Sequence, residues 1–427
     1  MLAAIGVSDL EALFRDIPQE IRDRFQPIGL EAKSEMEVAD ALGSMAARND
    51  AATRVSFLGG GIYDHYVPSI VPNLLSRSEF YTAYTPYQPE ISQGTLTAMF
   101  EFQTLVCELT GMDIANASMY DGSTALAEAV LMAERLRKKA RIAVASSLFE
   151  QVSRVLDTYC WAADIEILRL PFDERGCVSL ETLPEELSAV VLQTPNAFGV
   201  IEPLQGIKDQ IGDAMLVVAV NPLSLALLEP PASFGADIVV AEGQPLGLSM
   251  GFGGPLLGIF ATRDAYVRQM PGRMSGRTVD ADGNVGYTMA AQTREQHIRR
   301  ERATSNICTN SALCALAATI YMASAGAHGL RHVAALNFSR AHQLAKRLAS
   351  MEGIELAFQG EFFNEFVLRI PGRAAAVHEA LSEAGFLVEP SAVLEAYGLT
   401  DALRFAVTEK RTVEEIDRVV DIVGGVR

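Results

Sequence analysis

Lysine is the residue type whose number and position most restrict the chemistry open to this chain of 427 residues. A lysine amine can form an imine with a carbonyl compound and so anchor covalent catalysis. The chain contains only six lysines, which are Lys33, Lys138, Lys139, Lys208, Lys346 and Lys410. Lys138 and Lys139 end a charged helical pattern, and Lys208 lies on a polar one. So few lysines leave few positions at which an imine could form.

Histidine and cysteine do not form a recognisable site either. The six histidines and five cysteines show neither HExxH nor CxxC spacing, so we predict no metal site. The N-terminus has no basic segment ahead of its first acidic residues, and we therefore expect no signal peptide. The number of cysteines is odd and we expect no secretion signal. Both features are typical of a cytoplasmic protein whose thiols are reduced.

The densest group of hydrogen-bonding side chains lies in an aromatic segment between Phe80 and Gly94. Pro86 and Pro89 restrict its backbone, which favours a loop of fixed shape. We predict that its polar side chains line an active-site channel or an interface, since such loops often carry function. These residues are Tyr84, Tyr87, Gln88, Glu90, Ser92 and Gln93. The alternative, that the tyrosines only pack a subunit interface, explains the same residues.

A second candidate is a predicted helix start at residues 121–125. Gly122, Ser123 and Thr124 begin this helix, and the free N–H groups of a helix N-terminus can bind an anion. The same residues also suit an ordinary Ser/Thr cap with a glycine in the turn, which is the interpretation that we favour. We therefore predict at most a vestigial anion site.

The elements that must position these groups alternate from residue 112 onward. Short, unbroken apolar runs occur at 141–145, 165–170, 189–193, 215–220, 237–241 and 256–261. Helical patterns such as 124–139 and 149–160 separate them. This alternation is typical of a parallel sheet covered on both faces, and it predicts an α/β fold.

The two ends of the chain differ in pattern from this central part. Residues 8–53 are rich in acidic and aliphatic side chains at helical spacing, and Ser34 with Glu37 predicts a capping box. The C-terminal 100 residues or so read as a compact α+β unit. We predict an N-terminal helical arm (1–62), a large α/β domain (63–320) and a small C-terminal α+β domain (321–427).

Charge and hydropathy argue against two classes of partner. The net charge of −18 disfavours nucleic acid, because phosphate binding needs clustered Lys and Arg. The longest apolar stretch, at 311–325, is short and interrupted by Ser and Thr. We therefore predict a buried helix there and no membrane span.

Several longer motifs make the sequence resemble one known family. They are the segment 80–94 (Phe-Tyr-Thr-Ala-Tyr-Thr-Pro-Tyr-Gln-Pro-Glu-Ile-Ser-Gln-Gly), Ala-Asn-Ala-Ser at 115–118, Gly-Ala-Asp-Ile-Val at 235–239, Met-Gly-Phe-Gly-Gly-Pro at 250–255, Arg-Glu-Gln-His-Ile-Arg-Arg at 294–300 and Ser-Asn-Ile-Cys-Thr-Asn at 305–310. Together they resemble the P protein of the glycine cleavage system, glycine dehydrogenase (decarboxylating). The length of the chain matches the alpha subunit of the split, two-subunit form.

The resemblance implies a fold of the type I class of pyridoxal phosphate-dependent transferases, with a large parallel-sheet domain and a smaller C-terminal α+β domain. The cofactor needs a Schiff-base lysine, an acid near its pyridine nitrogen and donors for its phosphate. Gln244 or Pro245 stands where the resemblance places the lysine, and neither forms an imine. Asn221 stands in place of the acid, and a neutral amide cannot pair with a pyridinium. The resemblance therefore implies no catalytic residue in this chain.

The resemblance further implies a heterotetramer, α2β2, in which a beta subunit binds pyridoxal phosphate. Glycine would be decarboxylated there, and its aminomethyl group would pass to the lipoyl arm of the H protein. Two alternatives remain open for this chain. One alternative is a stabilising scaffold without substrate contact. The other, which the lysine inventory disfavours, is a self-sufficient pyridoxal phosphate-dependent lyase.

Overall fold

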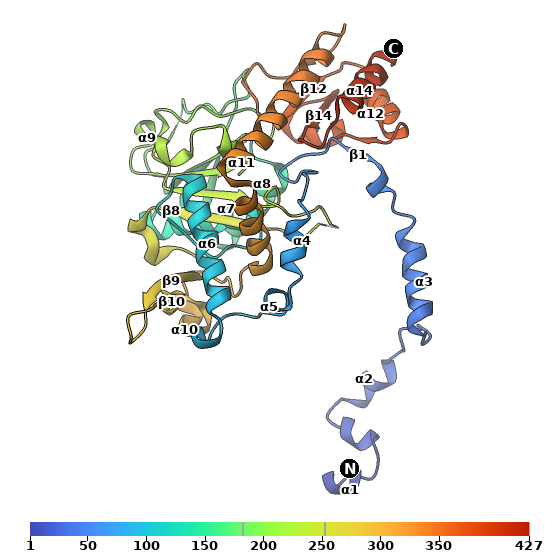
Figure 1. Ribbon diagram of the computed structural model, residues 1–427, viewed down its shortest axis with the longest axis vertical. Helices are drawn as coiled ribbons and strands as arrows, with labels where there is room; N and C mark the ends of the chain where they lie inside the picture. The colour runs from blue at the N-terminus through green and yellow to red at the C-terminus, as the bar shows by residue number, and fades with distance from the viewer. Residues whose placement is uncertain (182, 252, 427) are drawn as a thin grey trace. The chain divides into compact units, whose positions relative to one another are not determined.

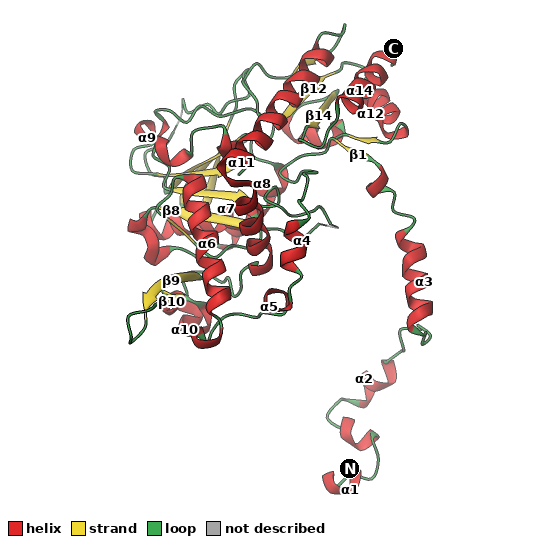
Figure 2. Cartoon of the chain, viewed as in Figure 1, coloured by secondary structure: helices red, strands yellow, loops and turns green. Residues whose placement is uncertain are grey.

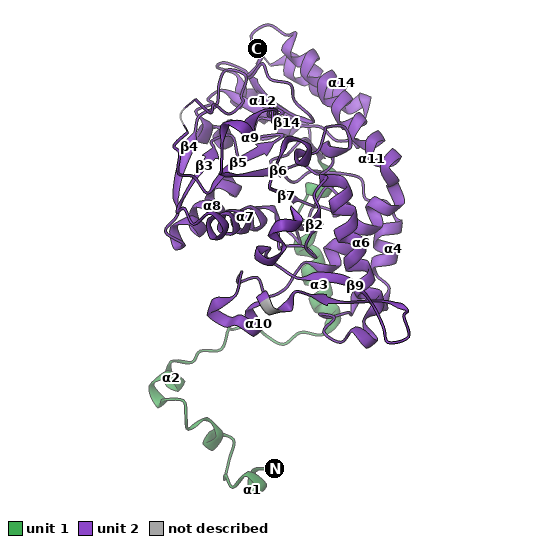
Figure 3. Cartoon of the chain, turned by 90° about the vertical axis from the view of Figure 1, so that its left-hand side faces the viewer, with its two compact units in different colours: residues 1–54 green, residues 55–427 purple. Residues whose placement is uncertain are grey.

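The computed structural model describes residues 1–181, 183–251 and 253–426. One residue of the 250–255 motif, Phe252, lies outside the described residues. The chain separates into two compact units, the first ending at Arg54 and the second beginning at Val55 (Figure 3). The proposed domain boundaries at 62/63 and 320/321 stay predictions.

The first unit is a series of short helices with no buried residue. It contains α1 (Leu2–Ile5), α2 (Gln19–Arg24) and α3 (Glu35–Ala46). The predicted capping box is present at the start of α3, where the Ser34 hydroxyl accepts a hydrogen bond from the Glu37 amide. Because it buries nothing, this unit gains little hydrophobic stabilisation by itself.

A seven-stranded sheet forms the centre of the second unit (Figures 1 and 2). Its strands, in spatial order, are β2 (Ile114–Ala115), β8 (Gly258–Thr262), β7 (Ile238–Glu242), β6 (Met215–Val220), β5 (Ala189–Thr194), β3 (Arg141–Ala145) and β4 (Glu166–Leu170). The strands from β4 to β7 are parallel, as predicted. β8 is antiparallel to both of its neighbours, so the sheet is mixed, and the predicted parallel pairing holds for the strands from β4 to β7 but not for the run that forms β8. The described residues between β7 and β8 form no crossover helix, so β8 returns in the opposite direction.

Long helices cover this sheet. They are α6 (Gln93–Thr110), α7 (Gly122–Arg137), α8 (Glu150–Ala162) and α11 (Ala312–Ala349). The buried positions of α7 include four alanines, which let the helix pack closely along β5 to β8. Shorter helices in the second unit are α4 (Ile70–Leu75), α5 (Ser78–Tyr81), α9 (Ile207–Gln210), α10 (Gln296–Arg299) and α13 (Ser391–Leu394).

The helix α11 connects the two hydrophobic cores of this unit. By length and composition α11 could cross a membrane, and it is the one such helix among the described residues. Its N-terminal half contributes Ala317 and Tyr321 to the core of the large sheet, and its C-terminal half contributes Leu344 to a second core. Gly326 breaks the helix with φ 61° and ψ 176°. We therefore interpret α11 as a kinked core helix.

The second core lies under a small antiparallel sheet near the C-terminus. That sheet has the order β11 (Glu355–Leu356), β12 (Glu365–Arg369) and β14 (Ala402–Ala406). The helices α12 (Ala374–Glu383) and α14 (Val413–Gly425) complete this part, together with a parallel pair of β1 (Val55–Ser56) and β13 (Phe386–Leu387). Phe57, Phe366 and Phe405 are fully or almost fully buried in its core.

A hairpin of β9 (Met274–Val279) and β10 (Val285–Ala290) lies outside both sheets. The sequence analysis did not identify it. It contacts α6, and this contact fixes one side of the candidate loop at residues 84–93.

Candidate functional site: a cavity at the carboxyl ends of β5 to β7

A cavity of about 120 Å³ lies where the parallel strands β5, β6 and β7 end. Gln193, Asn221 and Glu242 reach it from these three strand ends, and Ser123 reaches it from the start of α7. Ligands of open α/β sheets bind at this edge, because strand ends and helix N-termini meet there. The apolar part of the wall includes Ile62, Phe149, Val152, Ala219, Val220, Pro222, Val240, Ala241, Pro245 and Leu256.

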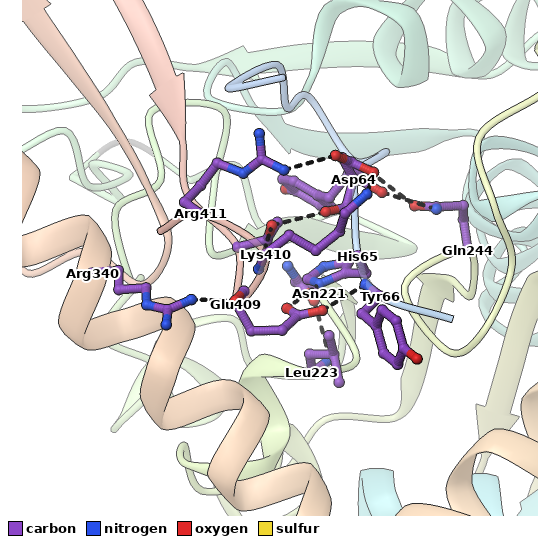
Figure 4. Close-up of polar contacts among 12 residues, drawn as sticks. Asp64, His65, Tyr66, Asn221, Leu223, Gln244, Arg340, Glu409, Lys410 and Arg411 are labelled. Atoms are coloured by element: carbon purple, nitrogen blue, oxygen red, sulfur yellow. Dashed lines mark hydrogen bonds and ion pairs between the residues drawn. The ribbon is translucent and has the colours of Figure 1, made fainter. Parts of the chain in front are cut away.

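Gln244 is committed to structural hydrogen bonds beside this cavity. Its side-chain Oε1 accepts from the Tyr63 amide at 2.9 Å, and its Nε2 donates to the carbonyls of Tyr63 and Leu248 at 3.0 and 2.7 Å. The residue is 1% exposed. Gln244 therefore fastens the segment at residue 63 to the loop after β7 (Figure 4). The neighbouring Pro245 forms part of the cavity wall.

Asn221 follows β6 and lines the cavity. Its Oδ1 accepts a hydrogen bond from the Leu223 amide at 3.0 Å (Figure 4). Its Nδ2 is buried and has no partner among the described residues. A buried donor without a partner costs free energy, and an amide offers no negative charge to a cationic ligand.

Glu242 at the end of β7 holds the start of α7. Its Oε2 accepts from the Gly122 amide at 2.9 Å, and its Oε1 accepts from the amides of Gln244 and Leu257 at 3.0 and 3.1 Å. Burial raises the pKa of Glu242 to about 7, although these three bonds favour the charged form. The sequence analysis did not identify this residue. A lone acidic residue that ends an otherwise apolar strand run is the signal that points to it.

The predicted helix start at Gly122, Ser123 and Thr124 has the geometry of an ordinary cap. Asp121 forms a capping box, in which its carboxylate accepts from the Thr124 amide at 2.9 Å. The amide of Gly122 binds Glu242, as described above. Two of the three amides are therefore already bound within the chain. Anion binding by this segment stays a prediction.

A buried charge cluster lies close to the cavity on the side of the small sheet. Arg404 is 3% exposed, and its Nη2 lies 2.5 Å from Oε2 of Glu389. Its Nε lies 3.5 Å from Oε1 of Glu365. Glu365 also accepts from the Gly60 amide and from the Tyr63 hydroxyl, and both of these residues line the cavity. Burial raises the pKa of Glu365, against the attraction of Arg404.

A further polar cluster holds the segment 64–66 against the loop after β14 (Figure 4). Nδ1 of His65 lies 2.8 Å from Oε2 of Glu409, and Nζ of Lys410 lies 2.6 Å from Oδ1 of Asp64. Arg411 also pairs with Asp64, at 3.0 Å. Lys410 is therefore bound in an ion pair. No lysine is among the residues that line the cavity in the described parts of the chain.

The candidate loop at residues 84–93 does not line this cavity. Tyr84 is 82% exposed and lies at a separate hollow of about 180 Å³, beside Asn310 and the start of α11. The side chains of Gln88 and Glu90 are exposed, and Ser92 is half-buried.

Internal hydrogen bonds hold the shape of this loop. The Tyr87 hydroxyl accepts from Arg273 Nη2 at 3.1 Å, and Gln93 exchanges two hydrogen bonds with the backbone of Tyr287. Arg273 is 3% exposed and also donates to Thr85. The loop is therefore anchored at Tyr87 and Gln93 and open at Tyr84.

The residues at the cavity do not fit pyridoxal phosphate. Gln244 and Pro245 give it no imine-forming lysine, and Asn221 gives no counter-charge for a pyridinium. In addition, Glu242 brings a carboxylate to the helix N-terminus at which a phosphate would be stabilised.

Comparison with known proteins gives one consistent family. Residues 1–423 match the family model described as glycine cleavage system P-protein. The chain is 48% identical over 435 aligned residues to a protein of Carboxydothermus hydrogenoformans, covering 100% of this chain and 97% of that protein. A protein of Thermotoga maritima is 53% identical over 372 residues, covering 87% and 84%. Both are named probable glycine dehydrogenase (decarboxylating) subunit 1.

Solved structures agree with this comparison. The crystal structure of glycine decarboxylase (P-protein) of the glycine cleavage system, in inhibitor-bound form, superposes with a TM-score of 0.92 at 42% identity. It covers 100% of this chain and 97% of that one. A sphingosine-1-phosphate lyase of Burkholderia pseudomallei has a TM-score of 0.69 at 15% identity, covering 94% of this chain and 92% of that one, and shares the fold alone.

Proposed function

The chain belongs to the glycine cleavage system P-protein family, in its glycine dehydrogenase (decarboxylating) subunit 1 branch, and we propose that it is the subunit that does not carry the cofactor. The family is pyridoxal phosphate-dependent. The observation that supports the proposal most is the cavity after β7, where Gln244 is tied into the backbone and Pro245 forms the wall. A lysine-bearing partner subunit would then supply the reactive site.

In this proposal the partner's cofactor decarboxylates glycine, and the aminomethyl group passes to the lipoyl arm of the H protein. The two kinds of subunit form an α2β2 complex in the cytoplasm. The present chain contributes the loop at residues 84–93 to one wall of the partner's active-site channel. Two features support this role: a hydrogen bond from Arg273 holds the loop at Tyr87, and Tyr84 is exposed and does not line the chain's own cavity.

Reductive labelling tests which subunit holds the cofactor. The full chain is incubated with pyridoxal phosphate, treated with borohydride and analysed by intact mass and peptide mapping. We expect no stoichiometric adduct on this chain, because no lysine lines its cavity in the described residues. The lysine-bearing subunit, treated in parallel, serves as the positive control, and glycine turnover is expected only when both are mixed. One lysine of this chain labelled one-to-one would contradict the proposal.

Substitution of Tyr84 tests the channel-wall role. We expect Tyr84→Ala to lower glycine turnover by the reconstituted complex about tenfold, the effect of losing roughly one good contact. Trp161→Ala is the matched control, because Trp161 is an equally exposed aromatic residue on α8, at 81% against 82%. Size-exclusion chromatography verifies that both variants assemble.

The scaffold alternative rests on a different feature of the same loop. Tyr87 and Gln93 bind internally, as packing residues do. If turnover by an assembled Tyr84→Ala complex equals that of the Trp161→Ala control, the loop does not touch substrate and the scaffold role is favoured.

A further inference from the structure

Glu242 is placed where a phosphate group would be stabilised in a fold of this kind. It ends β7 and faces the first turn of α7, a helix of 16 residues. The N-terminus of a long helix attracts anions through its free N–H groups and its dipole. In this chain a carboxylate already binds there, because Oε2 of Glu242 accepts a hydrogen bond from the Gly122 amide at 2.9 Å.

Both oxygens of the Glu242 carboxylate already accept hydrogen bonds within the chain. Three backbone amides donate to its two oxygens, from Gly122, Gln244 and Leu257. Gly122 is required for this close approach, since a Cβ at that position would lie 2.7 Å from the Glu242 backbone nitrogen. The helix start and the end of β7 are therefore built against each other.

The charge near the opposite side of the cavity is also balanced within the chain. Arg404 is the buried cation there, and Glu365 and Glu389 both pair with it. Phe149 lines the cavity, and the centroid of its ring lies 5.4 Å from the Arg404 guanidinium carbon. Among the described residues, no cationic side chain lines the cavity to bind an anionic ligand.

We propose that Glu242 is the residue that excludes phosphorylated ligands from this chain, because its carboxylate occupies the Gly122 amide and places a negative charge at the start of α7, where a phosphate would bind. The inference builds on the proposed function, in which the partner holds the cofactor, and it names the residue that prevents binding here. A phosphate at the start of α7 would have to displace the hydrogen bond from Gly122 and would lie beside the Glu242 carboxylate, which the Gln244 and Leu257 amides hold in place. Since burial raises the pKa of Glu242 to about 7, repulsion between like charges makes that unfavourable above this pH, and binding is therefore measured at pH 8 or above.

Binding of inorganic phosphate and of pyridoxal phosphate to the full chain tests this proposal. Equilibrium dialysis compares the wild type with Glu242→Ala and Glu242→Ser, both of which free the three amides. We expect no saturable binding to the wild type and at least about tenfold tighter binding of both anions to each variant, in proportion to the charge-assisted bonds gained. Pyridoxal, which lacks the phosphate, is expected to bind all three proteins equally. Glu166→Ala removes an exposed carboxylate and is the control.

Circular dichroism identifies which variants are folded. If one of the two Glu242 variants fails to fold, the other still tests the proposal. A folded variant that gains no affinity for phosphate would overturn the proposal, as would a wild type that binds phosphate as tightly as the variants. Neither result depends on glycine turnover. The exclusion role of Glu242 can therefore fail while the proposed subunit function holds, and the reverse is equally distinguishable.

Discussion

Replacement of Arg404 by methionine is expected to lower the free energy of unfolding by about 3–5 kcal/mol, the usual effect of removing one partner from a buried ion pair. Glu365 is 1% exposed and would be left without its cation. Glu389 would lose the hydrogen bonds from Nε and Nη2, and the Ala197 carbonyl would lose its donor at 2.8 Å. Urea-induced unfolding, followed by circular dichroism at neutral pH, measures the change.

Arg154→Met provides the matched control for this substitution. Arg154 forms an i,i+4 pair with Glu150 on the surface of α8, with its side chain 76% exposed. We expect a loss below about 1 kcal/mol there. The double variant Arg404→Met with Glu365→Gln should recover part of the stability, since it removes the unpaired charge. A loss for Arg404→Met no larger than the control's would show that the cluster is not stabilising.

The central strands were predictable because parallel strands buried on both faces appear as short, unbroken apolar runs. The runs at 141–145 and 215–220 coincide with β3 and β6 in both bounds. The direction of β8 was not predictable in this way. An apolar run has the same composition in a parallel and an antiparallel strand, and only the connection before it decides its direction.

The hairpin of β9 and β10 was missed for a different reason. Half of β9 is exposed, and its arginine and threonine gave no apolar run. A turn signal was nevertheless present at residues 280–284, where Asp280 accepts hydrogen bonds from the amides of Asp282 and Asn284. An Asp-Gly pair between two short strands is a strong sign of a hairpin.

The candidate site was predictable only where it depends on residue types. The family resemblance pointed to Gln244, Pro245 and Asn221, and the structure places Pro245 and Asn221 at the cavity wall with Gln244 beside it. The contacts of Glu242 and Arg404 could not be predicted. Gly122 and Glu242 lie 120 positions apart in the sequence, and Arg404 and Ala197 lie 207 positions apart. Local patterns carry no information about such distant pairs. A charge inside an apolar strand indicates that a partner exists, without saying which one.

Gly199→Ala is expected to destabilise the protein by about 3 kcal/mol or more, through overlap and backbone strain together. Gly199 has φ +79°, and a Cβ there would lie 1.8 Å from the backbone oxygen of Glu365. This glycine joins the loop after β5 to the small sheet, because its carbonyl accepts from the Phe363 amide at 3.1 Å. A larger residue would push apart the parts of the chain that carry Pro195 and Glu365 beside the cavity.

Gly206→Ala separates the two causes. Gly206 has nearly the same backbone conformation, φ +77°, but a Cβ there would meet no heavy atom within 4 Å. It should therefore cost only the left-handed strain, about 1–2 kcal/mol. The urea midpoints of the two variants are compared. The difference between their losses of stability is due to the overlap of the Gly199 Cβ with Glu365 of β12. Equal losses would mean that the contact between this loop and the small sheet is loose enough to yield, and the cavity wall that depends on it would not be rigid.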